Sequence, residues 1–278
     1  RADRMISDIS GEIISEKLSN SDYDKKINSL NIKCLKCKNS LSSVSRFNMM
    51  YDVGIGPKGD PSYLRPETCQ NIFVDFLRLS KTMRIKLPIG IAQFGKSFRN
   101  EISPRQSLLR LREFYQAEIE VFFNPTNVDN IEEFSEISDC VLNIHVSDDE
   151  IITAKCDELL DRGILPNQFI AYYLALVQQF YTSSGIELDK TRFRILPDDD
   201  RAFYATHSFD FEVLTSVGWL ELVACNNRTD YDLSSHQKIS GKDLQILDND
   251  EKVLPHVFEI SMGCLLYTSD AADERSSV

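Results

Sequence analysis

The residues with the clearest potential for chemistry lie on two stretches that a short loop separates. The first ends in Phe98-Arg99-Asn100-Glu101, and the second runs from Arg110 to Glu118. Because residues two apart on a strand share a face, we expect one side of the second stretch to carry Arg110, Arg112, Phe114, Gln116 and Glu118. One guanidinium can donate to two phosphate oxygens at once. An aromatic ring can stack on a base, and carboxylates can hold an ammonium group. This surface predicts joint recognition of a nucleotide and an amine; the alternative is an exposed strand face with alternating salt bridges.

These two stretches must be neighbouring strands if their side chains are to meet. The pattern predicts strands over residues 86–94, 108–123, 191–196, 202–214 and 217–226, the first two forming a hairpin. The side of the second strand that we expect to face the core carries Leu109, Leu111, Tyr115, Ala117 and Ile119. One helix is predicted to begin at Thr68, which would be its N-cap, and another to span residues 164–181. The sum is an α+β fold with a mostly antiparallel sheet and helices on its faces.

Composition limits the kinds of partner. The chain has 278 residues, of which 42% are hydrophobic, and 31 Lys and Arg against 43 Asp and Glu give a net charge of −12. Any contact with a nucleic acid must therefore be local. Seven cysteines, an odd number, predict a reducing compartment, for which the cytoplasm is the default and a mitochondrial form the alternative. No apolar run reaches the roughly 20 residues of a membrane span, so no membrane partner is expected.

Cys34 and Cys37 form a C-x-x-C pair near the N-terminus. Such a pair is half of a structural zinc site, and no second pair follows at the usual spacing. The two interpretations are a structural Zn²⁺ and a turn that carries two thiols. The sequence also contains no glycine-rich phosphate loop, so a bound nucleotide must be held by side chains on the sheet.

The order of these residues resembles a known family. The pattern Phe-Arg-x-Glu, a loop, then Arg-x-x-x-Phe-x-x-x-Glu is similar to motif 2 of class II aminoacyl-tRNA synthetases. Over residues 47–263 the resemblance narrows to glycyl-tRNA synthetases of the archaeal and eukaryotic kind. The strings that carry it are Tyr63-Leu-Arg-Pro-Glu-Thr68, Gln93-Phe-Gly-Lys-Ser-Phe-Arg-Asn-Glu-Ile-Ser-Pro-Arg105, Gly218-Trp-Leu-Glu-Leu-Val-Ala224, Asn227-Arg-Thr-Asp-Tyr-Asp-Leu233 and Val253-Leu-Pro-His-Val-Phe-Glu-Ile-Ser261.

The resemblance implies an ATP site with Mg²⁺ on the antiparallel sheet. Arg99 and Glu101 are then the expected catalytic residues, Phe114 would stack on adenine, and Glu221 would lie at the metal. The positions that match family contacts to ATP are Arg99, Asn100, Glu101, Arg110, Leu111, Phe114, Glu221 and Leu222.

The resemblance also implies a small acidic pocket for glycine. Carboxylates would hold the ammonium group, Arg228 would pair with the substrate carboxylate, and the lack of space would exclude larger amino acids. The matching positions are Glu67, Glu118, Arg228, Glu259, Ile260 and Ser261. The expected reaction is activation of glycine to glycyl-adenylate and transfer to tRNA(Gly) by a homodimer. The alternatives are a non-catalytic accessory or regulatory module of the same fold and a synthetase for alanine or serine.

Three segments are expected along the chain. Residues 1–46 form a partial N-terminal segment, 47–263 the catalytic core, and 264–278 a tail of foreign appearance. Leu266 stands where the family's motif 3 has an arginine that contacts adenine, which predicts impaired ATP binding by this chain. We also expect the C-terminal anticodon-binding domain to be absent, and the N-terminal dimer-forming motif to be absent or reduced.

Overall fold

The computed structural model describes residues 2–12, 14, 18–45, 47–101, 111–147, 150–198 and 200–263. The chain divides into two compact units, Arg1–Met49 and Met50–Val278. The boundary predicted from the sequence falls three residues earlier, after residue 46. Arg110, Leu266 and the predicted tail lie outside the described residues.

The first unit contains two short helices, α1 (Ala2–Ser10) and α2 (Asn20–Ser29). Their apolar faces supply a small core that includes Ile6, Tyr23 and Ile27. Helix α2 begins at Ser19, whose hydroxyl oxygen accepts a hydrogen bond from the backbone N–H of Asp22 at 3.2 Å. The chain then enters the turn that carries the C-x-x-C pair.

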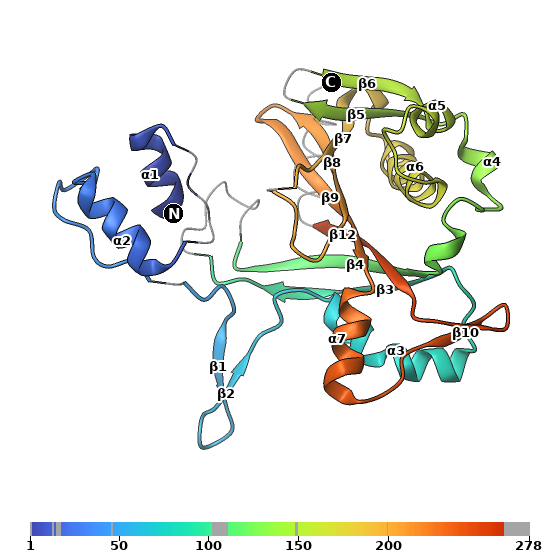
Figure 1. The fold of residues 1–278 in the computed structure, drawn as a ribbon, viewed down its shortest axis with the longest axis horizontal. Coiled ribbons are helices and arrows are strands. Elements are labelled where there is room, and N and C mark those ends of the chain that lie inside the picture. The colour runs from blue at the N-terminus through green and yellow to red at the C-terminus, as the bar shows by residue number, and fades with distance from the viewer. Residues whose placement is uncertain are drawn as a thin grey trace. The chain divides into compact units, whose positions relative to one another are not determined.

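An eight-stranded sheet forms the centre of the second unit, with strand order β3-β4-β12-β9-β8-β7-β5-β6 (Figure 1). All neighbours are antiparallel except β5 and β7, so the predicted α+β fold with a mainly antiparallel sheet is confirmed. The sequence did not predict β5 and β6. The strands are β3 (Ile89–Phe98), β4 (Glu113–Phe123), β5 (Val141–Ser147), β6 (Glu150–Lys155), β7 (Thr191–Ile195), β8 (His207–Thr215), β9 (Gly218–Thr229) and β12 (His256–Gly263).

Two small hairpins and several helices complete this unit. The hairpins are β1 (Asp52–Ile55) with β2 (Asp60–Tyr63) and β10 (Ile246–Asp248) with β11 (Glu251–Val253). The helices are α3 (Cys69–Met83), α4 (Phe134–Ile137), α5 (Cys156–Asp161), α6 (Gln168–Ser183) and α7 (Tyr231–Ser240), with 3-10 turns at Pro125–Asn127 and Leu188–Lys190. None of the described helices combines the length and hydropathy that crossing a bilayer requires.

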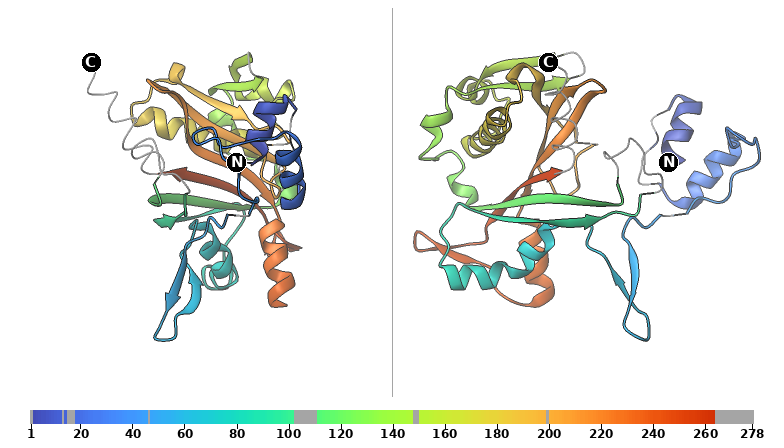
Figure 2. Two further views of the ribbon diagram at one scale, coloured as in Figure 1. Left: turned by 90° about the vertical axis from the view of Figure 1, so that its left-hand side faces the viewer. Right: turned by 180° about the vertical axis from the view of Figure 1, so that it is seen from behind.

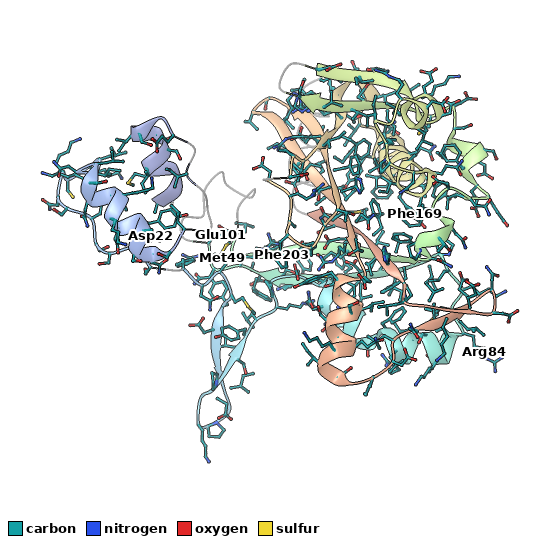
Figure 3. The ribbon with its side chains drawn as sticks, viewed as in Figure 1. Asp22, Met49, Arg84, Glu101, Phe169 and Phe203 are labelled. Carbon is teal, nitrogen blue, oxygen red and sulfur yellow. The ribbon has the colours of Figure 1, made fainter. Side chains whose placement is uncertain are left out.

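Helices cover both faces of the sheet (Figures 1 and 2). On one face α6 packs its apolar side on the strands, where Phe169 stacks on Phe123 with ring centroids 4.1 Å apart (Figure 3). On the other face α3 and α7 lie over β3, β4 and β12, and Phe76 stacks on Phe122 at 4.4 Å. Because α3 and α7 cover only part of their face, the remainder is open to ligands.

Strand β4 buries its polar side, which corrects the sequence prediction. Gln116, Glu118 and Glu120 are buried, whereas Tyr115 is 41% exposed and stacks on the exposed ring of Phe94 at 5.5 Å. Of the residues expected to face the core, Ile119 packs against the main core, Ala117 is half-buried and Leu111 lines a cavity. Leu109 lies outside the described residues. The polar side is buried because the start of α3 lies over it.

Candidate functional site

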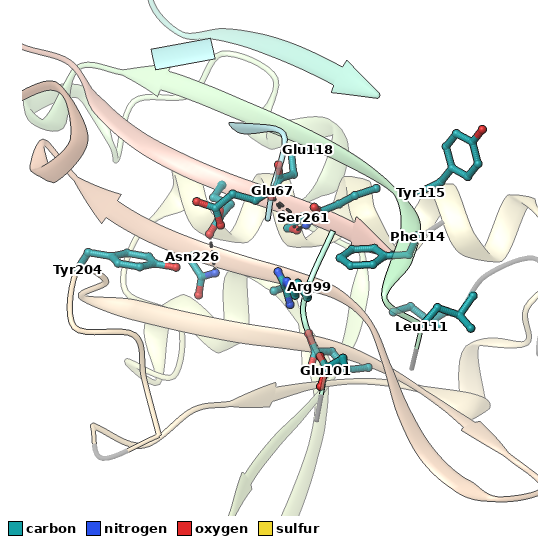
Figure 4. A pocket seen from close by; sticks show the side chains of 16 residues that line it. Glu67, Arg99, Glu101, Leu111, Phe114, Tyr115, Glu118, Tyr204, Asn226 and Ser261 are labelled. Carbon is teal, nitrogen blue, oxygen red and sulfur yellow. Dashed lines mark hydrogen bonds between the residues drawn. The ribbon is translucent and has the colours of Figure 1, made fainter. Parts of the chain in front are cut away.

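A cavity of about 460 Å³ opens over β4, β12 and β9 beside the start of α3 (Figure 4). Most of the residues predicted for nucleotide and amine recognition line it together. The lining residues are Glu67, Arg99, Glu101, Leu111, Phe114, Tyr115, Gln116, Glu118, Tyr204, Glu221, Leu222, Ala224, Asn226, Glu259, Ser261 and Gly263.

Glu118 connects the cavity to the N-terminus of α3. Its Oε2 accepts hydrogen bonds from the backbone N–H groups of Thr68 and Cys69, both at 2.6 Å, and from the Thr68 hydroxyl at 2.5 Å. Its Oε1 accepts from Gln116 Nε2 at 2.9 Å and from the Ser261 hydroxyl at 3.3 Å. Thr68 does precede the helix as predicted, but its side chain caps no backbone group. The carboxylate of the neighbouring strand caps the helix instead, where the helix dipole favours negative charge.

Glu259 and Arg228 form a buried ion pair at the edge of the cavity. Arg228 Nη1 lies 2.7 Å from Glu259 Oε1, while its Nε and Nη2 donate to the two oxygens of Asp232 at 2.7 and 2.9 Å. The guanidinium carbon is 4.1 Å from the centre of the Tyr204 ring. Asn226 Nδ2 donates to Glu259 Oε2 at 2.8 Å. Burial raises the pKa of Glu259 to about 7, and the positive charge of Arg228 opposes that rise.

Arg228 was predicted to pair with the substrate carboxylate, but in this structure its side chain does not line the cavity. Arg228 is 3% exposed and lies behind Glu259, outside the set of residues that line the cavity. Ile260 was also expected at the glycine site. Since it alternates with Glu259 and Ser261 on β12, its side chain points to the opposite face and packs in the core.

Arg99 and Phe114 lie side by side, as the hairpin predicted (Figure 4). Phe98 ends β3 opposite Glu113 of β4, and the backbone N–H of Arg99 donates to the Arg112 carbonyl at 3.0 Å. The Arg99 guanidinium carbon is 5.4 Å from the centre of the Phe114 ring. A base stacked on this ring would place its phosphates within reach of a guanidinium. Asn100 is half-buried and does not line the cavity.

Glu221 enters the cavity through an irregularity in β9. The register with β8 shifts between the pairs Phe211–Val223 and Glu212–Glu221, so Leu222 is an extra residue and Glu221 and Leu222 both line the cavity. Strict alternation would have placed Glu221 on the core side with Val223. The side chain of Glu221 reaches solvent, but the protein atoms around it remove part of its hydration. This desolvation and the charge of Glu212 raise the pKa of Glu221, and Arg99 opposes the rise. Glu221 thus offers the cavity one carboxylate of the kind that binds Mg²⁺. Glu212, its neighbour on β8, is buried, accepts from Arg192 at 2.6 Å and does not line the cavity.

Six lining residues were not predicted as site residues, namely Tyr115, Gln116, Tyr204, Ala224, Asn226 and Gly263. Alternation placed Gln116 on the strand face of Phe114 and Glu118 without assigning it to the site. Asn226 is two residues before Arg228, so alternation could have identified it as well. Tyr204 lies between β7 and β8, in a part of the predicted strand 202–214 that the structure leaves outside β8.

Cys34 and Cys37 lie in a tight turn of the first unit, closed by a 2.9 Å hydrogen bond from Lys38 N–H to the Cys34 carbonyl. Hydrogen bonds from the backbone at Cys37 and Lys36 lower the pKa of the Cys34 thiol below its ordinary value. Within the described part of the chain, no group of three metal-binding side chains includes either cysteine. The predicted zinc site thus remains a pair of thiols, which falls short of the four ligands of a structural site.

Comparison with known proteins agrees with this geometry. Residues 51–266 match the family described as tRNA synthetase class II core domain (G, H, P, S and T). The chain is 42% identical over 259 residues to a glycine–tRNA ligase of Pyrococcus furiosus, covering 91% of this chain and 45% of the relative, and 41% identical over 276 residues to one of Methanocaldococcus jannaschii, covering 95% and 48%. It thus spans about half the length of these relatives. Among solved structures, Giardia lamblia prolyl-tRNA synthetase in complex with prolyl-adenylate is similar at 16% identity and a TM-score of 0.48, covering 78% of this chain and 35% of that one. The chain belongs to the family of class II tRNA synthetase core domains.

Proposed function

We propose that this chain is the catalytic core of a glycine–tRNA ligase. The whole protein would join glycine to ATP as glycyl-adenylate, release pyrophosphate, and transfer the glycyl group to tRNA(Gly). The observation that carries this proposal is that a single cavity combines an aromatic ring and a guanidinium with three carboxylates, Glu67, Glu118 and Glu259. Relatives that carry the name glycine–tRNA ligase support the choice of substrate.

The acidic end of the cavity suits a small amine. Carboxylate oxygens of Glu67 and Glu118 lie within 4.8 Å of one another, close enough for one ammonium group to contact both. Ser261 and Gln116 fix the orientation of Glu118 through hydrogen bonds of 3.3 and 2.9 Å. Glycine offers no side chain to bind, so selectivity would rest on the exclusion of extra atoms.

The other end of the cavity suits the nucleotide. Arg99 would neutralise the negative charge that develops at the α-phosphate while the glycine carboxylate attacks phosphorus and pyrophosphate leaves. Phe114 would stack on adenine, 5.4 Å from the Arg99 guanidinium. Glu221, which lines this part of the cavity, would hold Mg²⁺. The ion would supply charge neutralisation at the phosphates.

Glycine-dependent exchange of pyrophosphate into ATP by the full-length parent protein tests this proposal. We expect exchange with glycine and little with alanine or serine. Exchange that prefers alanine or serine would reassign the substrate. A folded protein that binds tRNA but exchanges with none of the three would favour the accessory module.

We also propose that the intact protein is a homodimer that pairs through β3. This strand is the edge of the described sheet, and its Phe94 is 66% exposed and stacked on Tyr115. In the described part of the chain, Arg65 bonds to this edge only at Lys96 and Phe98, at the end of the strand. An exposed aromatic pair on a sheet edge favours contact with a second copy. Phe94→Asp should shift the parent protein to a monomer in analytical ultracentrifugation. Phe180→Asp, at a 52% exposed position on α6, is the matched control and should leave the dimer intact.

A further inference from the structure

Glu120 is a buried carboxyl group to which the proposed reaction assigns no role. It lies on β4 two residues after Glu118, on the same side of the strand, and pairs with Glu259 of β12 in the sheet register. Its side chain is 0% exposed, and within the described part of the chain neither of its oxygens has a hydrogen-bond partner. An ionised carboxylate is very unfavourable in such a position, because water is excluded and no donor replaces it.

The surroundings of Glu120 are acidic. The described titratable groups that face it come from α3, β4, β9, α7 and β12, namely Cys69, Glu118, Arg228, Asp232 and Glu259. Of these, Arg228 is the single cation, and its three nitrogen positions already bind Asp232 and Glu259. None of these bonds reaches Glu120, whose carboxyl the charge of Arg228 affects without a hydrogen bond.

The excess of buried negative charge is reduced if Glu120 is a neutral carboxylic acid. Its O–H needs an acceptor, and oxygens of Glu120 and Glu259 and the Cys69 sulfur lie within 4.8 Å of one another. Glu259 already accepts from Arg228 at 2.7 Å and from Asn226 at 2.8 Å, and each carboxylate oxygen has capacity for a further hydrogen bond. Glu259 is therefore the natural acceptor for the proton of Glu120.

We infer that Glu120 and Glu259 together retain one proton beneath the empty cavity, and that an ammonium group bound at Glu259 displaces this proton to solvent. Glu120 is then a positioning residue, which acts on the substrate only through Glu259. The inference rests on the proposed function for the identity of the amine. No bond to the substrate forms in this step, since one positive charge leaves the pair and another arrives beside it.

The directions of the pKa shifts agree with a retained proton. Burial, followed by the charge of Glu259, raises the pKa of Glu120 well above its ordinary value. Burial likewise raises the pKa of Glu259 to about 7. Because the two groups interact, the proton belongs to the pair and not to either carboxyl alone.

Infrared spectroscopy of this chain without any ligand tests the first half of the inference. We expect the carbonyl band of a protonated carboxylic acid at pH 7, which disappears when the chain is unfolded in urea. Glu120→Gln should reduce the band by the intensity of about one carboxylic acid, and Glu251→Gln, at an exposed position on β11, should leave it unchanged. Part of the band should remain in Glu120→Gln, because burial also raises the pKa of Asp210 to about 7. A wild-type spectrum without this band would overturn the inference even if the Glu120→Gln chain failed to fold.

Calorimetry of glycine binding to the parent protein tests the second half. Titrations in two buffers that differ in ionisation enthalpy report the protons released for each glycine bound. We expect release of up to about one proton near pH 7, and a clear reduction in Glu120→Gln. Binding with equal proton release in both proteins would overturn the coupling. Failure to bind glycine would contradict the proposed function, while the infrared result would still decide whether Glu120 is protonated.

Discussion

Replacement of Arg228 by methionine tests the buried ion pair that organises one side of the cavity. The guanidinium is 3% exposed and lies within 2.9 Å of oxygens on both Asp232 and Glu259. Methionine keeps a long apolar stem but leaves the two carboxylates buried without their cation. Removal of one partner from a buried pair costs about 3–5 kcal/mol.

This loss should be visible in thermal unfolding. A domain of this size loses roughly 2–4 °C in Tm for each kcal/mol, so the expected decrease is about 6–20 °C. Arg78→Met is the matched control, because Arg78 also forms a two-point pair, with Asp75 on α3, but the side chains are 67% and 47% exposed. An exposed pair contributes little to stability, so the Tm of Arg78→Met should decrease far less than that of Arg228→Met.

The pH dependence provides a second signature. Arg228 holds down the pKa of Glu259, so that pKa should rise further in Arg228→Met. The folded variant then binds more protons than the unfolded chain, and its stability increases as the pH falls. Calorimetric scans of Arg228→Met and Arg78→Met at several pH values between 5 and 8 measure this change in stability. If Arg228→Met were no less stable than Arg78→Met, or if its deficit did not shrink toward pH 5, our account of the buried pair would be wrong.

Three further substitutions test other parts of the site. Phe114→Ala should weaken ATP binding about 5- to 150-fold, the equivalent of 1–3 kcal/mol of base stacking, and unchanged ATP affinity in calorimetry would argue against adenine at this ring. Glu118→Gln should lower the free energy of unfolding in urea by about 0.5–2 kcal/mol, because it weakens the cap on α3; no measurable loss would show that the cap is dispensable. The raised pKa of Glu120 in the folded chain predicts that the wild-type chain loses stability as the pH rises above about 4.3. The loss should be up to roughly 1.4 kcal/mol per pH unit, because the unfolded chain releases a proton that the folded chain keeps. Glu120→Gln should reduce this slope without abolishing it, because the pKa values of Asp210 and Glu259 are also raised to about 7, and parallel pH profiles would refute the retained proton.

Several features could be predicted from the sequence because they depend on short-range geometry. A strand repeats every two residues, so Phe114 and Glu118 had to share a face, and a hairpin had to bring Arg99 near Phe114. The structure has these contacts, with 5.4 Å between the Arg99 guanidinium and the Phe114 ring. The order of the motif residues also identified the family, which the match over residues 51–266 confirms.

Other features depended on how distant segments pack. Only the position of α3 over β4 explains why Glu118 and Glu120 are buried, and only a register shift between β8 and β9 turns Glu221 into the cavity. Arg228 meets Asp232 four residues away but Glu259 thirty-one residues away, which no local pattern relates. Backbone periodicity determines which side chains share a face. Which element covers that face, and in what register, is decided by the packing of the whole sheet, because many pairings satisfy the same local pattern and only the assembled core distinguishes them.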